Sequence, residues 1–257
     1  MNSISRRRMI SQGMLGGAMV GAGLRVAAAS TAEATATPAR RKLRVMVTGG
    51  HPGDPEYGCG GTIARYADRG DEVLLLYLNK GDPAETASRP ASEVRVSEAG
   101  EACRVLGARP VFAGQIDGHA VVDPEHYERF RKLLQEQSPD AVFTHWPIDN
   151  HADHRAMFNL VYDAWIRLGR KFALYFYEVS TGEDTVQFSP TDYVDITATA
   201  ARKRKACYAH ASQSPDRYYA LQESVTRMRG LESGSNQAEA FVRHVQSPPF
   251  PLPPEAR

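Results

Sequence analysis

The sequence predicts an α/β fold in which helices cover both faces of a mostly parallel β-sheet. Short apolar segments of strand-like composition alternate with longer segments whose apolar residues recur at helical spacing. The segment Glu72–Leu78 is apolar almost throughout, as expected for a strand that is covered on both faces of a parallel sheet. We therefore expect strands joined by right-handed helical crossovers, forming a Rossmann-like three-layer sandwich.

The predicted elements alternate along the chain as such a fold requires. The expected strands are Leu43–Thr48, Glu72–Leu78, Pro110–Phe112, Ala141–Thr144 and Ala173–Val179. The expected helices are Thr62–Asp68, which Gly70 closes, a helix from the N-cap Ser92 to Gly107, one around Tyr127–Gln137, and Asp153–Leu168.

Polar side chains follow four of the predicted strands directly. They are His51 and Asp54; Asn79, Lys80 and Asp82; Asp117, Gly118 and His119; and the run from His145 to His154. In sheets of this kind, ligands bind beyond the carboxyl ends of the strands. The loops at one edge of the sheet are therefore expected to carry the chemistry.

Residues 1–29 are expected to be a targeting signal that is removed from the mature protein. Arg6, Arg7 and Arg8 precede a short apolar stretch rich in Gly, Ala and Met, and the small residues 27–29 follow it. The stretch is shorter than the roughly 20 apolar residues of a spanning helix, although a retained anchor remains the alternative. The segment Ser5–Ile10 resembles a twin-arginine (Tat) export signal, which predicts a periplasmic or extracellular protein without a membrane span.

Composition divides the rest of the chain into three parts. Residues 30–41 read as an Ala/Thr/Pro-rich disordered linker, residues 42–247 as one domain, and residues 248–257 as a proline-rich tail. Four of the 31 basic residues and none of the 30 acids lie in residues 1–29, so the mature chain is slightly acidic. This balance gives no reason to expect nucleic acid as a partner, and the sequence is silent on the oligomeric state.

The cysteines and the glycine-rich segment have structural interpretations. Cys59, Cys103 and Cys207 are odd in number and far apart, so we expect buried free thiols and no disulfide or metal ligation. The spacing of Gly58–Gly61 does not match a dinucleotide-binding loop, and these glycines are expected to let the backbone pass close to the neighbouring polar loop.

Two short segments concentrate histidine and aspartate just beyond predicted strands. They are Gly50–Glu56 and Asp149–His154. Catalytic zinc takes three nitrogen or oxygen ligands and keeps one position open for water. A histidine and an aspartate three residues apart in a proline-rich loop, together with a histidine from the second loop, supply that number.

These segments also resemble the motifs of a known family. Gly50–Glu56 with its continuation Tyr57–Thr62 resembles the His-Pro-Asp-Asp-Pro-Glu and Gly-Cys-Gly-Gly-Thr signature of the LmbE/PIG-L deacetylases, and His151–His154 resembles the family's His-x-Asp-His motif. Further landmarks are Asp117-Gly118, His210–Gln213 and Glu239–Phe241, so the similarity runs from about Leu43 to Val245. It implies an LmbE-like fold and a hydrolase in which metal-activated water removes an N-acetyl group from an N-acylated sugar or related amide.

The resemblance also implies a role for each site residue. His51, Asp54 and His154 would bind Zn²⁺. His151 would stand beside the metal as an imidazolium that polarises the amide oxygen or protonates the leaving amine, and Asp153 would orient it. The alternative for Asp153 is a structural one, a helix N-cap or a first-turn acid.

Position 53 departs from the family pattern. The family has an aspartate there that serves as general base, whereas this chain has Gly53. The role is vacant or filled from elsewhere, and the nearby acids are Glu56, Asp153 and Asp117, with Asp117 the first to test. If the rest of the site keeps the family geometry, Gly53→Asp should keep the metal and raise deacetylation at least about tenfold. The alternatives to a deacetylase are a non-catalytic metal- or sugar-binding module and a zinc hydrolase of another amide or ester.

The export signal predicts the fate of a double substitution. Arg6→Lys with Arg7→Lys should leave the precursor in the cytoplasm, because the paired guanidinium groups are what the Tat pathway reads. Fractionation of cells that express the full chain measures this. Unchanged secretion of the double variant would show that the Tat assignment is wrong.

Overall fold

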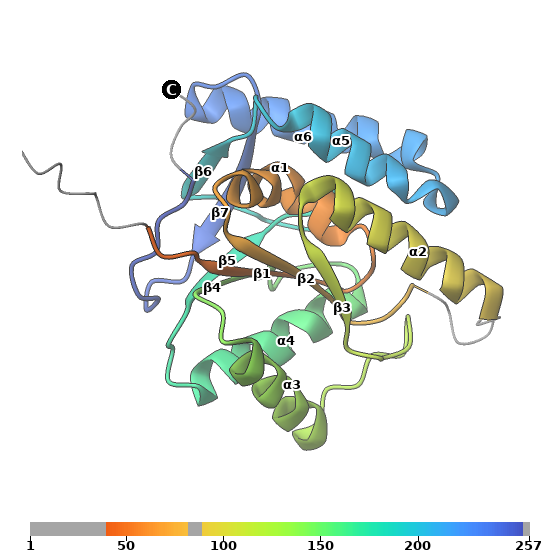
Figure 1. The fold of residues 1–257 in the computed structure, drawn as a ribbon, viewed down its shortest axis with the longest axis vertical. Coiled ribbons are helices and arrows are strands. Elements are labelled where there is room, and N and C mark those ends of the chain that lie inside the picture. Colours follow the sequence, from red (N-terminus) through yellow and green to blue (C-terminus); the bar gives the residue numbers. More distant parts are fainter. Residues whose placement is uncertain (1–39, 82–88, 254–257) are drawn as a thin grey trace, which may run out of the picture. The chain divides into compact units, whose positions relative to one another are not determined.

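A β-sheet organises the chain from Arg41 onward (Figure 1). The computed structural model describes residues 40–81 and 89–253, and it describes the side chains of all of these except 89–92. The predictions for residues 1–39, the export signal and most of the linker, lie outside the described residues. No helix among the described residues is long and apolar enough to span a membrane.

The sheet has seven strands within the described residues, in the order β3-β2-β1-β4-β5-β7-β6. They are β1 (Arg44–Gly49), β2 (Glu72–Tyr77), β3 (Arg109–Phe112), β4 (Ala141–His145), β5 (Ala173–Tyr177), β6 (Asp192–Asp195) and β7 (Ala238–Arg243). Strands β1 to β5 run parallel, and β7 is antiparallel to both of its neighbours. The predicted α/β sandwich with a mostly parallel sheet is therefore confirmed.

Helices cover both faces of this sheet. They are α1 (Asp54–Asp68), α2 (Arg89–Leu106), α3 (Pro124–Gln137), α4 (Ala152–Arg167), α5 (Ala200–Ala209) and α6 (Pro215–Ser233), with a 3-10 turn, η1 (Ala211–Gln213), before α6. Figure 1 shows α3 and α4 on one face and the other four helices on the opposite face. The two hydrophobic cores that result explain the apolar run of β2: Val73 and Leu75 pack toward α1 and α2, whereas Leu74 and Leu76 pack toward α3 and α4.

Helix α1 begins eight residues before the predicted start at Thr62. Asp54 is its first residue, and the glycine-rich segment lies inside the helix. A Cβ atom at Gly58 would overlap the ring of Tyr177 on β5, and one at Gly61 would overlap Ile196. The glycines therefore let α1 pack directly against its neighbours, which outweighs their low helix propensity. Helix α2 likewise begins at Arg89, before the predicted cap at Ser92.

Buried contacts hold the C-terminal third of the chain on α1. Lys203 of α5 and Glu239 of β7 form a fully buried ion pair of 2.6 Å, and Glu239 also accepts hydrogen bonds from the N–H groups of Gly61 and Thr62. The segment predicted as a tail from residue 248 packs on the core through Phe250 and Leu252. The three cysteines are buried and free, as predicted.

The topology creates one crevice suited to a ligand. Strand β1 lies between β2 and β4, so the chain leaves β1 toward one side of the sheet and later returns on its other side. At such a switch point the connecting loops diverge and open a crevice at the carboxyl ends of the two strands. The segments after β1 and β4 are Gly50–Asp54 and Trp146–His151, so the two histidine-rich segments meet there.

Candidate active site

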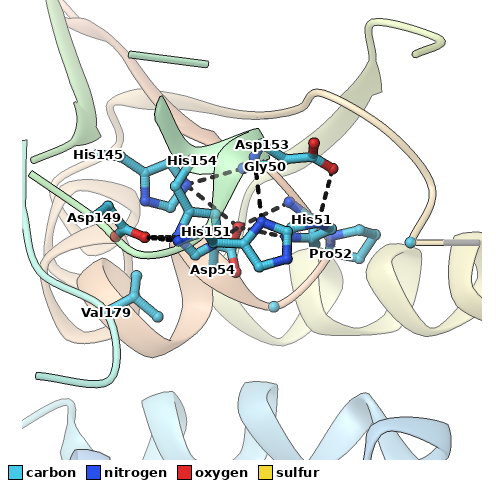
Figure 2. Close-up of polar contacts among 12 residues, drawn as sticks. Gly50, His51, Pro52, Asp54, His145, Asp149, His151, Asp153, His154 and Val179 are labelled. Carbon is cyan, nitrogen blue, oxygen red and sulfur yellow. Dashed lines mark hydrogen bonds and ion pairs between the residues drawn. The ribbon is translucent and has the colours of Figure 1, made fainter. Parts of the chain in front are cut away.

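The structure brings the six predicted site residues together at the carboxyl edge of β1 and β4. His51 lies in the turn between β1 and α1, and Asp54 is the first residue of α1. His151 caps α4, and Asp153 and His154 lie in its first turn. Asp117 comes from the loop after β3. Figure 2 shows His51, His151 and His154 gathered around Asp54.

One oxygen of the Asp54 carboxylate is the centre of this group. Oδ2 accepts a hydrogen bond of 2.8 Å from the backbone N–H of His51, which closes the turn. The same oxygen lies 3.4 Å from Nδ1 of His51 and 3.2 Å from Nε2 of His154. Helices α1 and α4 both begin here, so the positive ends of two helix dipoles favour negative charge at this point.

The far ring nitrogens of both histidines contact carboxylates. Nδ1 of His154 lies 3.1 Å from Oδ1 of Asp149. Nε2 of His51 lies 3.0 Å from Oδ1 of Asp117 and 3.2 Å from Oδ2 of Asp153. A carboxylate on the far nitrogen is what fixes the ring orientation of metal-binding histidines in proteins.

Two distances within the predicted ligand set of His51, Asp54 and His154 match those expected between the ligands of a divalent metal. Bonds of about 2.0–2.1 Å to a tetrahedral zinc place its ligand atoms about 3.3 Å apart. The two distances from Asp54 Oδ2 to the ring nitrogens, 3.4 and 3.2 Å, match that separation. Three groups of side chains in the described residues lie close enough to share an ion: His51, His151 and His154; Asp54, His145 and His154; and His51, Asp117 and Asp153. The predicted set of His51, Asp54 and His154 is not one of these groups, but it shares two members with each of the first two.

Attraction between opposite charges outweighs burial in setting the pKa values of Asp54 and His154. Burial opposes ionisation of Asp54, but His154, His145 and His51 hold the pKa of its carboxyl well below the usual range. Burial likewise opposes protonation of His154, yet Asp54 and Asp149 raise its pKa to about 9. Because a metal must displace the protons that these histidines bind, metal binding releases protons.

The structure corrects the expected relation between Asp153 and His151. Oδ2 of Asp153 accepts hydrogen bonds from the Asn79 side chain and from the Gly118 N–H, both at 2.9 Å, and contacts His51. Asp153 therefore orients His51. His151 instead accepts a hydrogen bond at Nδ1 from the Asp153 N–H, as a helix N-cap.

His151 is also neutral, where an imidazolium was expected. Burial, then the positive charges of His51 and His154, lower its pKa. Because Nδ1 accepts a backbone hydrogen bond, the ring proton lies on Nε2. A neutral imidazole with Nε2–H is a hydrogen-bond donor toward the cleft.

His145, at the end of β4, is a site residue whose role the sequence did not indicate. Its Nε2 accepts a hydrogen bond of 3.0 Å from the Gly50 N–H, and its ring stacks on that of His154 with centroids 4.0 Å apart. Burial, then the charge of His154, lower its pKa to about 4. Neutral His145 thus contacts both histidine-rich segments and supports them. The signal in the sequence that could have found it is its position directly after the predicted strand Ala141–Thr144.

The site opens into a cleft of about 420 Å³, a volume suited to a small-molecule ligand. His51, Asp54, His151 and His154 lie in it, and its walls carry Arg95, Asp117, Glu183, Asp184, Gln213, Arg217 and Tyr218. A larger hollow between β6 and the end of α6 has Asp195 as its only ionisable group besides Tyr193. The chemistry therefore resides in the smaller cleft.

The three proposed substitutes for the missing base are held by other contacts. Glu56 is fully buried and binds Tyr77, His210 and the Gly53 N–H, so it serves the fold. Asp153 is also fully buried. Asp117 lines the cleft, but its Oδ1 holds His51.

The backbone at Gly53 corrects the expectation for Gly53→Asp. Gly53 has φ 114° and ψ −40°, a conformation that residues with a side chain rarely adopt. A Cβ atom there would meet nothing closer than the Tyr57 ring at 3.7 Å, so the obstacle is the backbone and not the space. An aspartate at position 53 cannot face the site without moving the turn that carries His51 and Asp54.

We therefore predict that Gly53→Ala and Gly53→Asp each lower the free energy of unfolding by about 1–3 kcal/mol, because a strained backbone conformation costs that much. Gly100→Ala is the matched control, since a Cβ atom at Gly100 in α2 meets nothing within 4 Å. It should raise stability by about 0.5–1 kcal/mol. Urea denaturation measures all three, and a Gly53→Asp variant with wild-type stability and raised activity would contradict this account.

Comparisons with known proteins match the part of the chain that carries this site. The family model described as PIG-L, GlcNAc-PI de-N-acetylase, matches residues 46–165. Diacetylchitobiose deacetylase of Thermococcus kodakarensis is 23% identical over 80% of this chain and 83% of its own. The 4-oxalmesaconate hydratase of Pseudomonas putida is 23% identical over 78% of this chain and 84% of its own.

A solved structure shows the same fold. The conserved protein TT1542 of Thermus thermophilus superposes with a TM-score of 0.69 and 29% identity over 81% of this chain and 97% of its own. The matched family segment runs from β1 to the end of α4, so it contains both histidine-rich segments and the switch point between them. The segment from β1 to α4 thus resembles the PIG-L (LmbE-like) family of N-acetylglucosaminyl deacetylases, and the fold over most of the chain is that of the solved relative.

Proposed function

We propose that this protein is a zinc-dependent N-deacetylase of an amino-sugar-type substrate. The observation that supports it best is the donor set of Asp54, His51 and His154, in which each ring turns one nitrogen to Asp54 and the other to a carboxylate. Two imidazoles and one carboxylate suit catalytic zinc. When bound, zinc would act as a Lewis acid that polarises the amide carbonyl and lowers the pKa of water.

The chain's own groups would complete the site. His151 lies in the cleft with Nε2–H as a donor, so it can hydrogen-bond the amide oxygen as negative charge develops there. The starts of α1 and α4 add their dipoles to the same effect. Asp117, Asp153 and Asp149 hold the two histidine rings in place.

We infer the substrate class from the substrates of similar proteins. Those that match over most of this chain include a deacetylase of diacetylchitobiose, so we propose an N-acetylated amino sugar. The second candidate is hydration, which the similarity to 4-oxalmesaconate hydratase favours. We also propose that the protein acts after export, on the evidence of its N-terminal sequence alone.

The metal assignment predicts the effect of single substitutions. His51→Ala, Asp54→Ala and His154→Ala should each reduce bound zinc from about one equivalent to less than about a tenth, because each removes one of three protein ligands. Acetate release from N,N′-diacetylchitobiose should fall to background in all three variants and in wild type treated with chelator. Elemental analysis and an acetate assay measure the two quantities.

His126→Ala is the matched control, because His126 pairs with Asp123 on α3 and lies outside the site. It should keep wild-type zinc and activity. Full zinc content in His51→Ala or His154→Ala would contradict the ligand set. Zinc binding without acetate release from any N-acetylated sugar, or turnover of 4-oxalmesaconate instead, would contradict the proposed deacetylase function.

A further inference from the structure

Four carboxylates line the cleft: Asp54, Asp117, Glu183 and Asp184. Asp54 and Asp117 are occupied with His51, and Glu183 is exposed to solvent at the rim. Asp184 is partly buried and contacts neither of the proposed metal-binding histidines through a hydrogen bond described in the structure. We propose that Asp184 is the general base of this site and replaces the carboxylate that the family carries at position 53, an inference that rests on the proposed deacetylase function.

Asp184 reaches both parts of the cleft. It lines the part that contains Asp54, His151 and His154. It also lines the adjoining hollow of about 380 Å³ that contains Pro52 and Gly53, where the family's aspartate would stand. Asp184 therefore lines both the space beside the proposed metal-binding residues and the space that glycine leaves at position 53.

The backbone of Asp184 is anchored to the segment that carries the histidines. Its carbonyl accepts a hydrogen bond of 2.8 Å from the Asn150 N–H, and its own N–H binds the carbonyl of Ser180. The next residue, Thr185, donates from its hydroxyl to Oδ2 of Asp149 at 3.2 Å. Asp149 in turn holds His154. The position of Asp184 relative to the metal-binding residues is therefore fixed by short, specific contacts, as a catalytic group requires.

The environment of Asp184 suits proton transfer near neutral pH. Burial raises its pKa to about 6; Asp54 and Asp149 add to the rise, whereas His154 and a hydrogen bond with Ser180 oppose it. A general base works best with a pKa near the operating pH. Other charged or titratable groups that share its cleft are His51, Arg95, Asp117, His151, Glu183, Arg217 and Tyr218.

With Asp184 as the base, hydrolysis of the amide needs no reactant other than water. The oxygen of water forms a bond to the amide carbon while one water proton passes to the Asp184 carboxylate. The C–N bond then breaks, and that proton passes from Asp184 to the departing nitrogen. The free amine leaves together with acetic acid, which still carries the second proton of the water and releases it to solvent to become acetate, and Asp184 returns to its ionised form.

The test compares variants of the zinc-loaded full chain on N,N′-diacetylchitobiose and N-acetylglucosamine. Asp184→Asn and Asp184→Ala should lower kcat by at least about 100-fold, the low end for general-base catalysis, with KM changed less than about threefold. Zinc content and thermal unfolding should stay at wild-type values. Formate should raise kcat of Asp184→Ala at least about tenfold, because a small carboxylate can occupy the vacated space. Glu101→Gln is the matched control, because Glu101 is an exposed carboxylate on α2 that pairs with Arg104 and does not line the cleft; it should change kcat less than about threefold.

Wild-type kcat in both Asp184 variants would overturn the proposal while leaving the deacetylase function intact. So would a loss of kcat that formate does not restore or that accompanies loss of zinc, because Asp184 would then act through structure alone. If the wild type releases no acetate from any N-acetylated sugar, the proposed function itself is contradicted, and the role of Asp184 is overturned with it.

Discussion

The crowding of groups around Oδ2 of Asp54 is the interaction on which the site depends. A backbone N–H and the rings of His51 and His154 approach this single oxygen, and it lies at the meeting point of two helix N-termini. Burying a carboxylate in this way is favourable only because these partners compensate the loss of water. The turn from His51 to Asp54, the start of α1 and the orientation of His154 are therefore held by one carboxylate.

Several features of the fold place Asp54 and its partners. The divergence of loops between β1 and β4 brings the two histidine-rich segments together, and the glycines of α1 let that helix pack against β5. The buried pair of Lys203 and Glu239 then holds α1 from behind, through the N–H groups of Gly61 and Thr62. Breaking a buried pair by removing one partner costs about 3–5 kcal/mol, so a contact far from the cleft helps to fix the position of Asp54.

Much of the fold could be predicted from the sequence because apolar periodicity reports burial directly. The five parallel strands were placed to within two residues at either end, since each alternates with a periodic helix. The start of α1 could not be placed, because glycine is a poor helix former and its value here lies in contacts with Tyr177 and Ile196 from distant parts of the chain. Strands β6 and β7 were missed for a similar reason, since their pairing is antiparallel and joins segments far apart in sequence.

In the site, too, local sequence patterns allowed predictions, whereas contacts between distant segments could not be predicted. Motifs brought His51, Asp54 and His154 into one hypothesis, because residue type and spacing define ligands well. Which atoms touch depends on tertiary geometry, so the pairing of Asp153 with His51 and the backbone of Gly53 were out of reach. Asp184 lies in the loop that follows β5, and the rule that ligands gather at the carboxyl ends of strands is the signal that could have found it.

Anomalous diffraction at the zinc edge, from crystals of the zinc-loaded protein, tests the central role of Asp54 most directly. We expect one strong peak within about 2.2 Å of Asp54 Oδ2, with ring nitrogens of His51 and His154 at similar distances. A peak held instead by His51, Asp117 and Asp153, or no peak at this edge of the sheet, would contradict it.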